Sequence, residues 1–334
     1  MFGFGSMLKD YLDYYKISQT EFADRLNISQ KHMNEIINGK TNISNDLILA
    51  ISLLTNIDAN LIYYVENKRK AHEYLNKKFK SEKEIKDYLN SFSIKEMNER
   101  KWIRLKDENS LVQNYMDLIE YINVKDIDVL DSYLEKRYLF KKMDNADNKK
   151  IYLWIRHCDL MTSNIDICDY NSNNLDLLFD ELKLEQNKKF NINRLIKIFN
   201  KYGIILYIED ALKGTKVRGA IKVKINTPVI YMTKYYKEKS SFYYALYHEL
   251  GHLKKDYNKL KNKTIIDDEE KIDEFALNKM IDKKIYNEIL DNYENKDKIA
   301  KENNIPFCFL YSRLAYEKKI KYNSKEYLNH IERI

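Results

Sequence analysis

Proline and glycine are scarce in this sequence, which contains two Pro and seven Gly among 334 residues. Because both residues interrupt helices and favour turns, their scarcity predicts a mostly helical chain with few long loops. With 44% apolar and 33% charged residues, the composition is typical of a soluble globular protein, and the length allows two domains. The formal charge of +7 is compatible with nucleic-acid binding without requiring it.

Disulfides and membrane spans are also not expected. The three cysteines, Cys158, Cys168 and Cys308, leave one thiol unpaired and lack metal-ligand spacing, so we expect reduced core thiols in a cytoplasmic protein. Polar residues interrupt the most apolar stretch, 47–65, which predicts two packed helices and no membrane partner. Charges at 9–10 come before any apolar segment, so we expect no signal peptide.

Capping signals divide residues 6–75 into short helices. Ser18, with Glu21 three residues later, forms a capping box at the start of the second helix. Ser29 caps a third helix, 30–38, which Asn38 and Gly39 end. The remaining helices are expected over 7–15, from Ser44 and from Asp58.

Residues 17–40 resemble the helix-turn-helix of Xre/Cro-like repressors, and that of HigA antitoxins in particular. Ala23 stands where the two helices need a small residue, while Ile28 and Ile36 stand at core positions. The resemblance implies a DNA-binding domain over 1–75 that binds a double-stranded operator as a homodimer.

Polar side chains at the start of the third helix suit base edges in the major groove, and those at the helix ends suit phosphates. The expected base contacts are Ser29, Gln30, Lys31, His32 and Asn34, and the expected phosphate contacts are Gln19, Asn38 and Lys40. Two alternatives stay open: an ordinary solvated helix face, or a domain that binds protein instead of DNA.

The predicted fold class is α+β and mostly helical. Residues 76–150, rich in Lys and Glu, are expected to form a helical connector. The domain over 151–334 combines helices with a small β-sheet, because strand-like runs precede a long helix over 240–255. The expected strands are 204–208, 217–223 and 229–232, and further helices are expected around Trp154, over 191–202 and over 267–280.

The long helix carries His248, Glu249 and His252 in an HExxH array. Histidines four residues apart share one helix face and can bind one zinc ion, beside which the glutamate can act as a general base. Gly251 would let a neighbouring segment approach closely. The alternative is two surface histidines on an ordinary helix. A third ligand is required, and the downstream carboxylates are Asp267, Asp268, Glu269, Glu270, Asp273 and Glu274.

Residues 150–325 resemble the peptidase-bearing members of the HigA antitoxin group. Within them, the run 248–276 and its surroundings resemble the ImmA/IrrE metallopeptidases, whose HExxH precedes a Glu-x-x-Ala-Asn/Asp-x-Phe-Ala helix. Here that helix reads Glu269-Glu-Lys-Ile-Asp273-Glu-Phe275-Ala276. The resemblance implies a zincin-like domain with Zn²⁺ as cofactor, Glu269 as third ligand and Asp273 as its hydrogen-bonding support, with Glu270 as the alternative ligand. It implies a DNA-binding regulator that hydrolyses a specific protein or acts on a cognate toxin.

Two further elements bear on peptide hydrolysis, and the second of them, an oxyanion stabiliser, is needed for it. An edge strand, 217–221 or 229–232, would pair with an extended substrate, although either can be purely structural. An oxyanion stabiliser would come from Tyr231, Tyr247 or Arg218. The alternative function is a non-enzymatic antitoxin or repressor in which the zinc site is structural or vestigial.

Overall fold

The computed structural model describes residues 3–129, 147–235, 237–262 and 269–334. They group into two compact units, 1–127 and 128–334, and the chain is mostly helical with one small sheet. The packing thus divides the chain once, near residue 127, whereas the sequence led us to expect two boundaries, at 75 and 150. Among the described residues, no helix is both long and apolar enough to cross a membrane.

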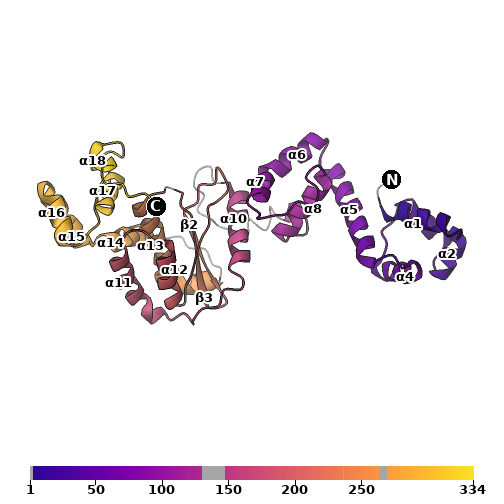
Figure 1. Cartoon of the computed structure of the whole chain (residues 1–334), viewed down its shortest axis with the longest axis horizontal. Coiled ribbons are helices and arrows are strands. Elements are labelled where there is room, and N and C mark those ends of the chain that lie inside the picture. The colour runs from indigo at the N-terminus through magenta and orange to yellow at the C-terminus, as the bar shows by residue number, and fades with distance from the viewer. Residues whose placement is uncertain (1–2, 130–146, 236, 263–268) are drawn as a thin grey trace. The chain divides into compact units, whose positions relative to one another are not determined.

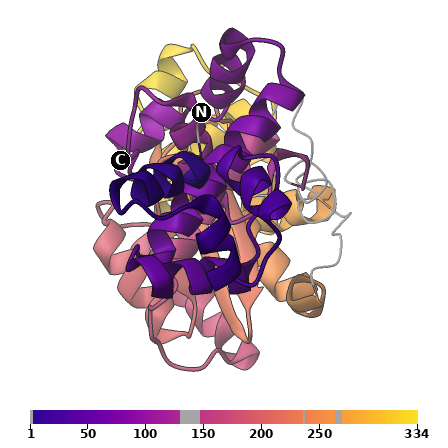
Figure 2. The same cartoon turned by 90° about the vertical axis from the view of Figure 1, so that its right-hand side faces the viewer.

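The first unit is all-helical, and its first four helices, indigo in Figure 1 and Figure 2, share one core with the start of the fifth. Its helices are α1 (Phe4–Tyr14), α2 (Gln19–Arg25), α3 (Gln30–Ile37), α4 (Asn45–Thr55), α5 (Ala59–Lys78), α6 (Glu82–Ser91), α7 (Ile94–Glu99) and α8 (Leu111–Ile122).

The predicted caps start these helices. The side chains of Ser18, Ser29, Ser44 and Asp58 each accept a hydrogen bond from a backbone N–H of the following turn. The carboxylate of Glu21 pairs with Arg25 one turn further on.

The second unit contains a three-stranded sheet among helices. Its elements are α10 (Asn148–Met161), α11 (Leu175–Glu185), α12 (Ile192–Lys201), β1 (Ile205–Ile208), β2 (Gly219–Lys224), β3 (Thr227–Met232), α13 (Lys239–Asn262), α14 (Glu269–Met280), α15 (Lys283–Asp291), α16 (Lys296–Glu302), α17 (Phe307–Tyr316) and α18 (Lys325–Leu328), with short 3₁₀ turns at Ser172–Asn174 and Tyr293–Asn295.

The sheet order is β1-β3-β2, with β3 parallel to β1 and antiparallel to β2. Since β3 pairs on both sides, the prediction that 229–232 is a substrate-binding edge is wrong. The edge next to α13 is β2, which overlaps the other predicted edge, 217–221. Among the described residues β1 is the other edge strand of this sheet, and β2 is the edge strand that packs against the HExxH helix.

Helices cover both faces of the sheet (Figure 1). On one face, Ile230 and Met232 of β3 belong to the main core together with α11, α12 and α13. On the other face, Tyr231 meets Trp154 of α10, as the alternation of side chains along a strand requires. One face of the sheet therefore packs against α13.

The cysteines are free thiols, and Cys158 and Cys308 are buried as expected. Cys168 is exposed, so the expectation that all three are core residues is wrong. It lies outside the regular helices and strands, where its thiol contacts the carbonyl of Asn200 at the end of α12.

Candidate metal centre and nucleic-acid interface

One face of α13 brings together the two histidines of the HExxH array, and α14 adds a carboxylate. The Nε2 atoms of His248 and His252 lie 3.1 Å apart. Glu269 Oε2 lies 3.3 Å from the first of these atoms, and Glu269 Oε1 lies 3.6 Å from the second. Of the described residues, these three form the group of His, Cys, Asp and Glu side chains that could hold a metal ion.

These separations fit a tetrahedral zinc ion. Bonds of about 2.0–2.1 Å in tetrahedral geometry place neighbouring ligand atoms about 3.3 Å apart. Two imidazole nitrogens facing each other at 3.1 Å would otherwise need a shared proton between them. The donor set of two nitrogens and one carboxylate is the set that leaves a fourth position open in catalytic zinc sites.

Asp273 orients the first histidine. Its Oδ1 lies 2.9 Å from His248 Nδ1 and accepts a hydrogen bond of 2.8 Å from the Tyr244 hydroxyl. A proton held on Nδ1 leaves Nε2 free to face the other ligand atoms, which is the usual support for a metal-binding histidine. Tyr244 was missed by the sequence analysis, although it stands one turn before His248 and hence on the same face.

Burial and mutual repulsion perturb the titration of the centre. Burial lowers the pKa of His248, but the hydrogen bonds to Asp273 and Glu269 outweigh it and raise that pKa. Burial and the charge of His248 lower the pKa of His252, so the two rings do not both carry a positive charge. Burial raises the pKa of Glu249 to about 7, near the pH where a general base is most effective.

Two glycines allow the close approaches that build the site. A Cβ on Gly251 would lie 2.9 Å from Cδ1 of Phe275, so the glycine lets α14, which carries Glu269, pack closely against α13. A Cβ on Gly219 would lie 2.9 Å from Glu249 Oε1, so the start of β2 lies directly against the predicted base. The prediction that Gly251 permits a close approach is confirmed.

The structure does not bring two of the predicted oxyanion stabilisers to the centre. Tyr231 donates to Asp159 on the α10 face of the sheet, and the buried Tyr247 donates to Gln186. Arg218 lies nearer the centre, before Gly219, with its guanidinium 5.9 Å from the ring of Tyr244. Tyr231 and Tyr247 are therefore withdrawn as candidates.

The other downstream carboxylates do not compete for the ligand position in the part of the chain that the structure describes. Glu270 is exposed, and Glu274 pairs with Lys283 at 2.9 Å. Asp267 and Asp268 lie outside the described residues. The charged Lys254, which follows the array, points outward to Asp176 on α11.

In the first unit, α2 and α3 form a helix-turn-helix. Buried Ala23 lies between them, Asn27 has a left-handed φ of 52° in the turn, and Ile36 is buried. Ile28 packs partly buried against the same core. Gly39, with φ of 65°, ends α3 as predicted.

The predicted DNA contacts differ in how accessible they are. Ser29, Gln30, Lys31, Asn34 and Lys40 are exposed, while Gln19, His32 and Asn38 are partly buried. Three of them have local roles in the protein as well. Ser29 Oγ caps α3 by accepting the N–H of His32, and Asn38 Nδ2 donates to Oδ1 of Asn34 at 2.7 Å. Gln30, Lys31 and Lys40 are exposed and take no part in these bonds.

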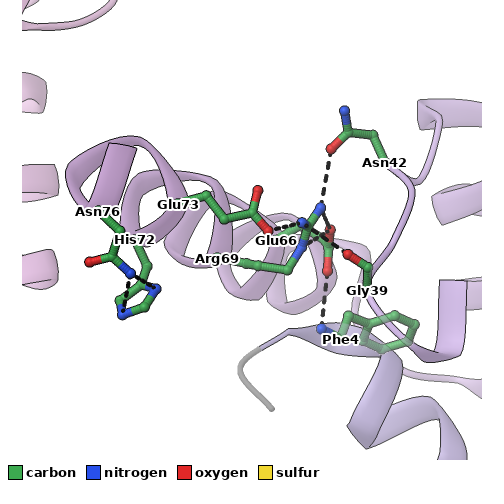
Figure 3. A network of polar contacts seen from close by, with 8 residues as sticks. All are labelled: Phe4, Gly39, Asn42, Glu66, Arg69, His72, Glu73 and Asn76. Carbon is green, nitrogen blue, oxygen red and sulfur yellow. Dashed lines mark hydrogen bonds and ion pairs between the residues drawn. The ribbon is translucent and has the colours of Figure 1, made fainter. Parts of the chain in front are cut away.

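A buried ion pair of α5 holds the end of α3 (Figure 3). Arg69 donates to Glu66 at 2.9 Å, to the carbonyl of Gly39 at 3.4 Å and to Asn42 at 3.1 Å. The other oxygen of Glu66 accepts the backbone N–H of Phe4 at the start of α1. One ion pair thus joins α1, α5 and the residues that follow α3, Gly39 and Asn42. The sequence analysis missed it.

Comparison with known proteins bears on this unit alone. Residues 8–62 match the family model described as Helix-turn-helix, an Xre-like domain, and this match supports a DNA-binding regulator. The matched range covers α2 and α3 and ends within α5, well before the metal centre. Neither a search of curated proteins nor a search of solved structures found a match.

Proposed function

We propose that this protein is a DNA-binding transcriptional regulator, close to HigA-like antitoxins, whose second unit is a zincin-like, zinc-dependent endopeptidase. The observation that carries the proposal is the convergence of His248, His252 and Glu269 beside Glu249. A structural zinc site needs no buried carboxylate next to an open position, whereas hydrolysis does.

The residues divide the chemistry among them. A zinc ion held by the three ligands would supply a Lewis acid that activates water. Glu249 takes a proton from the attacking water and passes it to the leaving amine. Because Gly219 has no side chain, the start of β2 lies against Glu249. A peptide paired with this strand would therefore lie close to the base. Arg218 is the remaining candidate for stabilising the oxyanion.

Operator binding would use α3 in the major groove of double-stranded DNA, with Gln30 and Lys31 reaching base edges. Operators of this kind have two half-sites, which requires a homodimer. Leu49 and Leu53, one turn apart on α4, are 53% and 83% exposed. An apolar surface of this kind is one that proteins bury on association, and it supports self-association through the first unit.

The second candidate is a non-enzymatic antitoxin or repressor with a structural or vestigial zinc site. The specific observation in its favour is that only the helix-turn-helix has a family match. The two candidates differ in what Glu249 does, because a structural site would tolerate its replacement without loss of function.

The first experiment measures metal content by elemental analysis on the full-length protein and on His252→Ala and Glu269→Ala. Glu270→Ala is the matched control, since this neighbouring carboxylate is exposed. We expect about one zinc per chain in the wild type and the control, and loss of zinc in the other two, because a site with two ligands binds zinc weakly. Binding to the DNA upstream of the protein's own gene should persist in all four.

Absence of zinc from wild-type protein that also fails to take it up would refute the metal centre. If zinc is present, Glu249→Gln separates the two candidates. The peptidase predicts that this variant keeps its zinc and forms a stable complex with a protein that the wild type cleaves.

A further inference from the structure

The hydroxyl of Tyr244 and the ring of the first histidine share one carboxylate oxygen. Oδ1 of Asp273 accepts a hydrogen bond of 2.8 Å from the Tyr244 hydroxyl and lies 2.9 Å from His248 Nδ1. On α13, Tyr244 stands one turn before His248. On α14, Asp273 stands one turn after Glu269. The hydrogen bond of Tyr244 therefore joins the two helices beside their proposed ligands.

Close packing alone does not fix either end of this bond. The Asp273 carboxylate is 31% exposed, so without a donor it could turn toward solvent. The ring of Tyr244 lines a cavity of about 360 Å³ at the N-terminal end of α13, so open space lies on one side of the ring. The hydrogen bond therefore sets the direction of the carboxylate, and the carboxylate in turn keeps a proton on Nδ1 of His248.

The second histidine has no such support in the part of the chain that the structure describes. Its side chain is 8% exposed, and its Nδ1 atom is buried without a hydrogen-bond partner among the described residues. A metal-binding imidazole is normally oriented by an acceptor for its outer N–H group. The orientation of the histidine pair therefore depends on one series of hydrogen bonds, from Tyr244 through Asp273 to His248.

We infer that Tyr244 is a positioning residue for the zinc ion. Its hydroxyl fixes the Asp273 carboxylate, which holds His248 in the orientation that binds the metal. This role rests on the metal centre of the proposed function. Removing the hydroxyl while keeping the ring should therefore lower zinc affinity and leave the fold intact.

The test is a double-mutant cycle on the full-length protein, with zinc affinity measured by competition with a fluorescent chelator. Loss of a direct partner of a metal-binding histidine costs about 10–100-fold in affinity, which we expect for Asp273→Ala. Tyr244→Phe acts one bond further out and should cost about 3–10-fold. Because Tyr244 acts through Asp273, adding Tyr244→Phe to Asp273→Ala should weaken zinc binding no further.

Tyr247→Phe is the matched control. It removes a buried hydroxyl from the same helix, next to His248, but the partner of this hydroxyl is Gln186. We expect its zinc affinity to equal that of the wild type. Urea unfolding of each variant shows whether a change in affinity comes from a loss of fold.

Cobalt(II) in place of zinc provides a readout that a purely structural role would not change. The Nδ1–H protons of cobalt-bound histidines give strongly shifted proton NMR signals that disappear in D₂O. We expect Tyr244→Phe to shift one of these signals, the same one that Asp273→Ala removes, and to leave the other in place. Tyr247→Phe should leave both signals unchanged.

An unchanged zinc affinity in Tyr244→Phe would overturn the inference. Equal weakening by Tyr244→Phe in the wild-type and Asp273→Ala backgrounds would also overturn it, because Tyr244 would then act by another route. Wild-type protein that binds neither zinc nor cobalt would refute the metal centre itself. Both readouts measure metal binding, so the expected results would support this role even if the zinc site proved to be structural.

Discussion

Gly251 shapes the candidate metal centre without contributing a ligand to it. Its missing side chain lets Phe275 and Ile272 of α14 pack directly on α13, and α14 carries Glu269. An added Cβ would lie 2.9 Å from Phe275 Cδ1 and 3.1 Å from Ile272 Cγ2, closer than van der Waals contact. Either α14 or the side chains must shift, and the carboxylate at the start of α14 moves with the helix.

We therefore expect Gly251→Ala to weaken zinc binding and Gly251→Val to weaken it further. The valine variant should also lose about 1–3 kcal/mol of stability through overpacking. Competition with a fluorescent zinc chelator measures the affinity. Lys254→Ala is the control on the same helix, because Lys254 faces outward. Unchanged zinc affinity in Gly251→Val would mean that α14 does not depend on this contact.

Prediction of site residues from the sequence succeeded where neighbours on one helix form the site. It failed where the outcome depends on the direction in which a side chain points. The i, i+4 spacing of His248 and His252 identifies a shared helix face. Tyr247 precedes His248 in sequence, but adjacent residues on a helix point about 100° apart, and its hydroxyl bonds to Gln186 in the core. Tyr231 points to the other face of the sheet, a choice that depends on the register of β3.

At the scale of elements, the buried pair of Glu66 and Arg69 fixes how α5 meets α1 and the end of α3 (Figure 3). Both side chains are only 7% exposed. In sequence, two opposite charges three residues apart are typical of a solvated helix face, so this burial could not be predicted. The starts of helices could be predicted, because a Ser or Asp cap acts within one turn. Strand order could not, because it depends on pairing between distant segments.

We expect Arg69→Met to destabilise the first unit by about 3 kcal/mol, since it leaves a buried carboxylate without its cation. The Glu66→Leu, Arg69→Met double variant should recover part of this loss. Glu73→Ala, which removes an exposed partner of Arg69, should cost less than about 1 kcal/mol. Urea unfolding followed through Trp102, in a Trp154→Phe background, measures these changes.

A double variant as unstable as Arg69→Met would contradict the desolvation argument. It would instead assign the loss to the contacts of Arg69 with Gly39 and Asn42. DNA binding of the folded variants then shows whether holding the end of α3 contributes to operator affinity.

At the scale of the whole molecule, the family match lies in the first unit and the candidate metal centre lies in the second. DNA binding and zinc binding can therefore each be measured in the full-length protein. The chain has two tryptophans, and each unit contains one: Trp102 in the first and Trp154 in the second. Single-tryptophan variants, Trp154→Phe and Trp102→Phe, therefore report on the units separately within the full chain.

All three proposed ligands belong to the second unit, so zinc should stabilise the fold around Trp154. Zinc at about 100 times its dissociation constant would add about 2.7 kcal/mol, because it binds the folded chain in preference to the unfolded one. For a unit of this size, removing zinc with EDTA should lower the midpoint of the Trp154 transition by about 5–10 °C. His252→Ala should abolish this difference. If the midpoint of the Trp102 transition stays in place, the stabilisation belongs to the second unit. If the midpoints of both transitions shift, the two units unfold together. An unchanged midpoint of the Trp154 transition would contradict zinc binding by the folded protein.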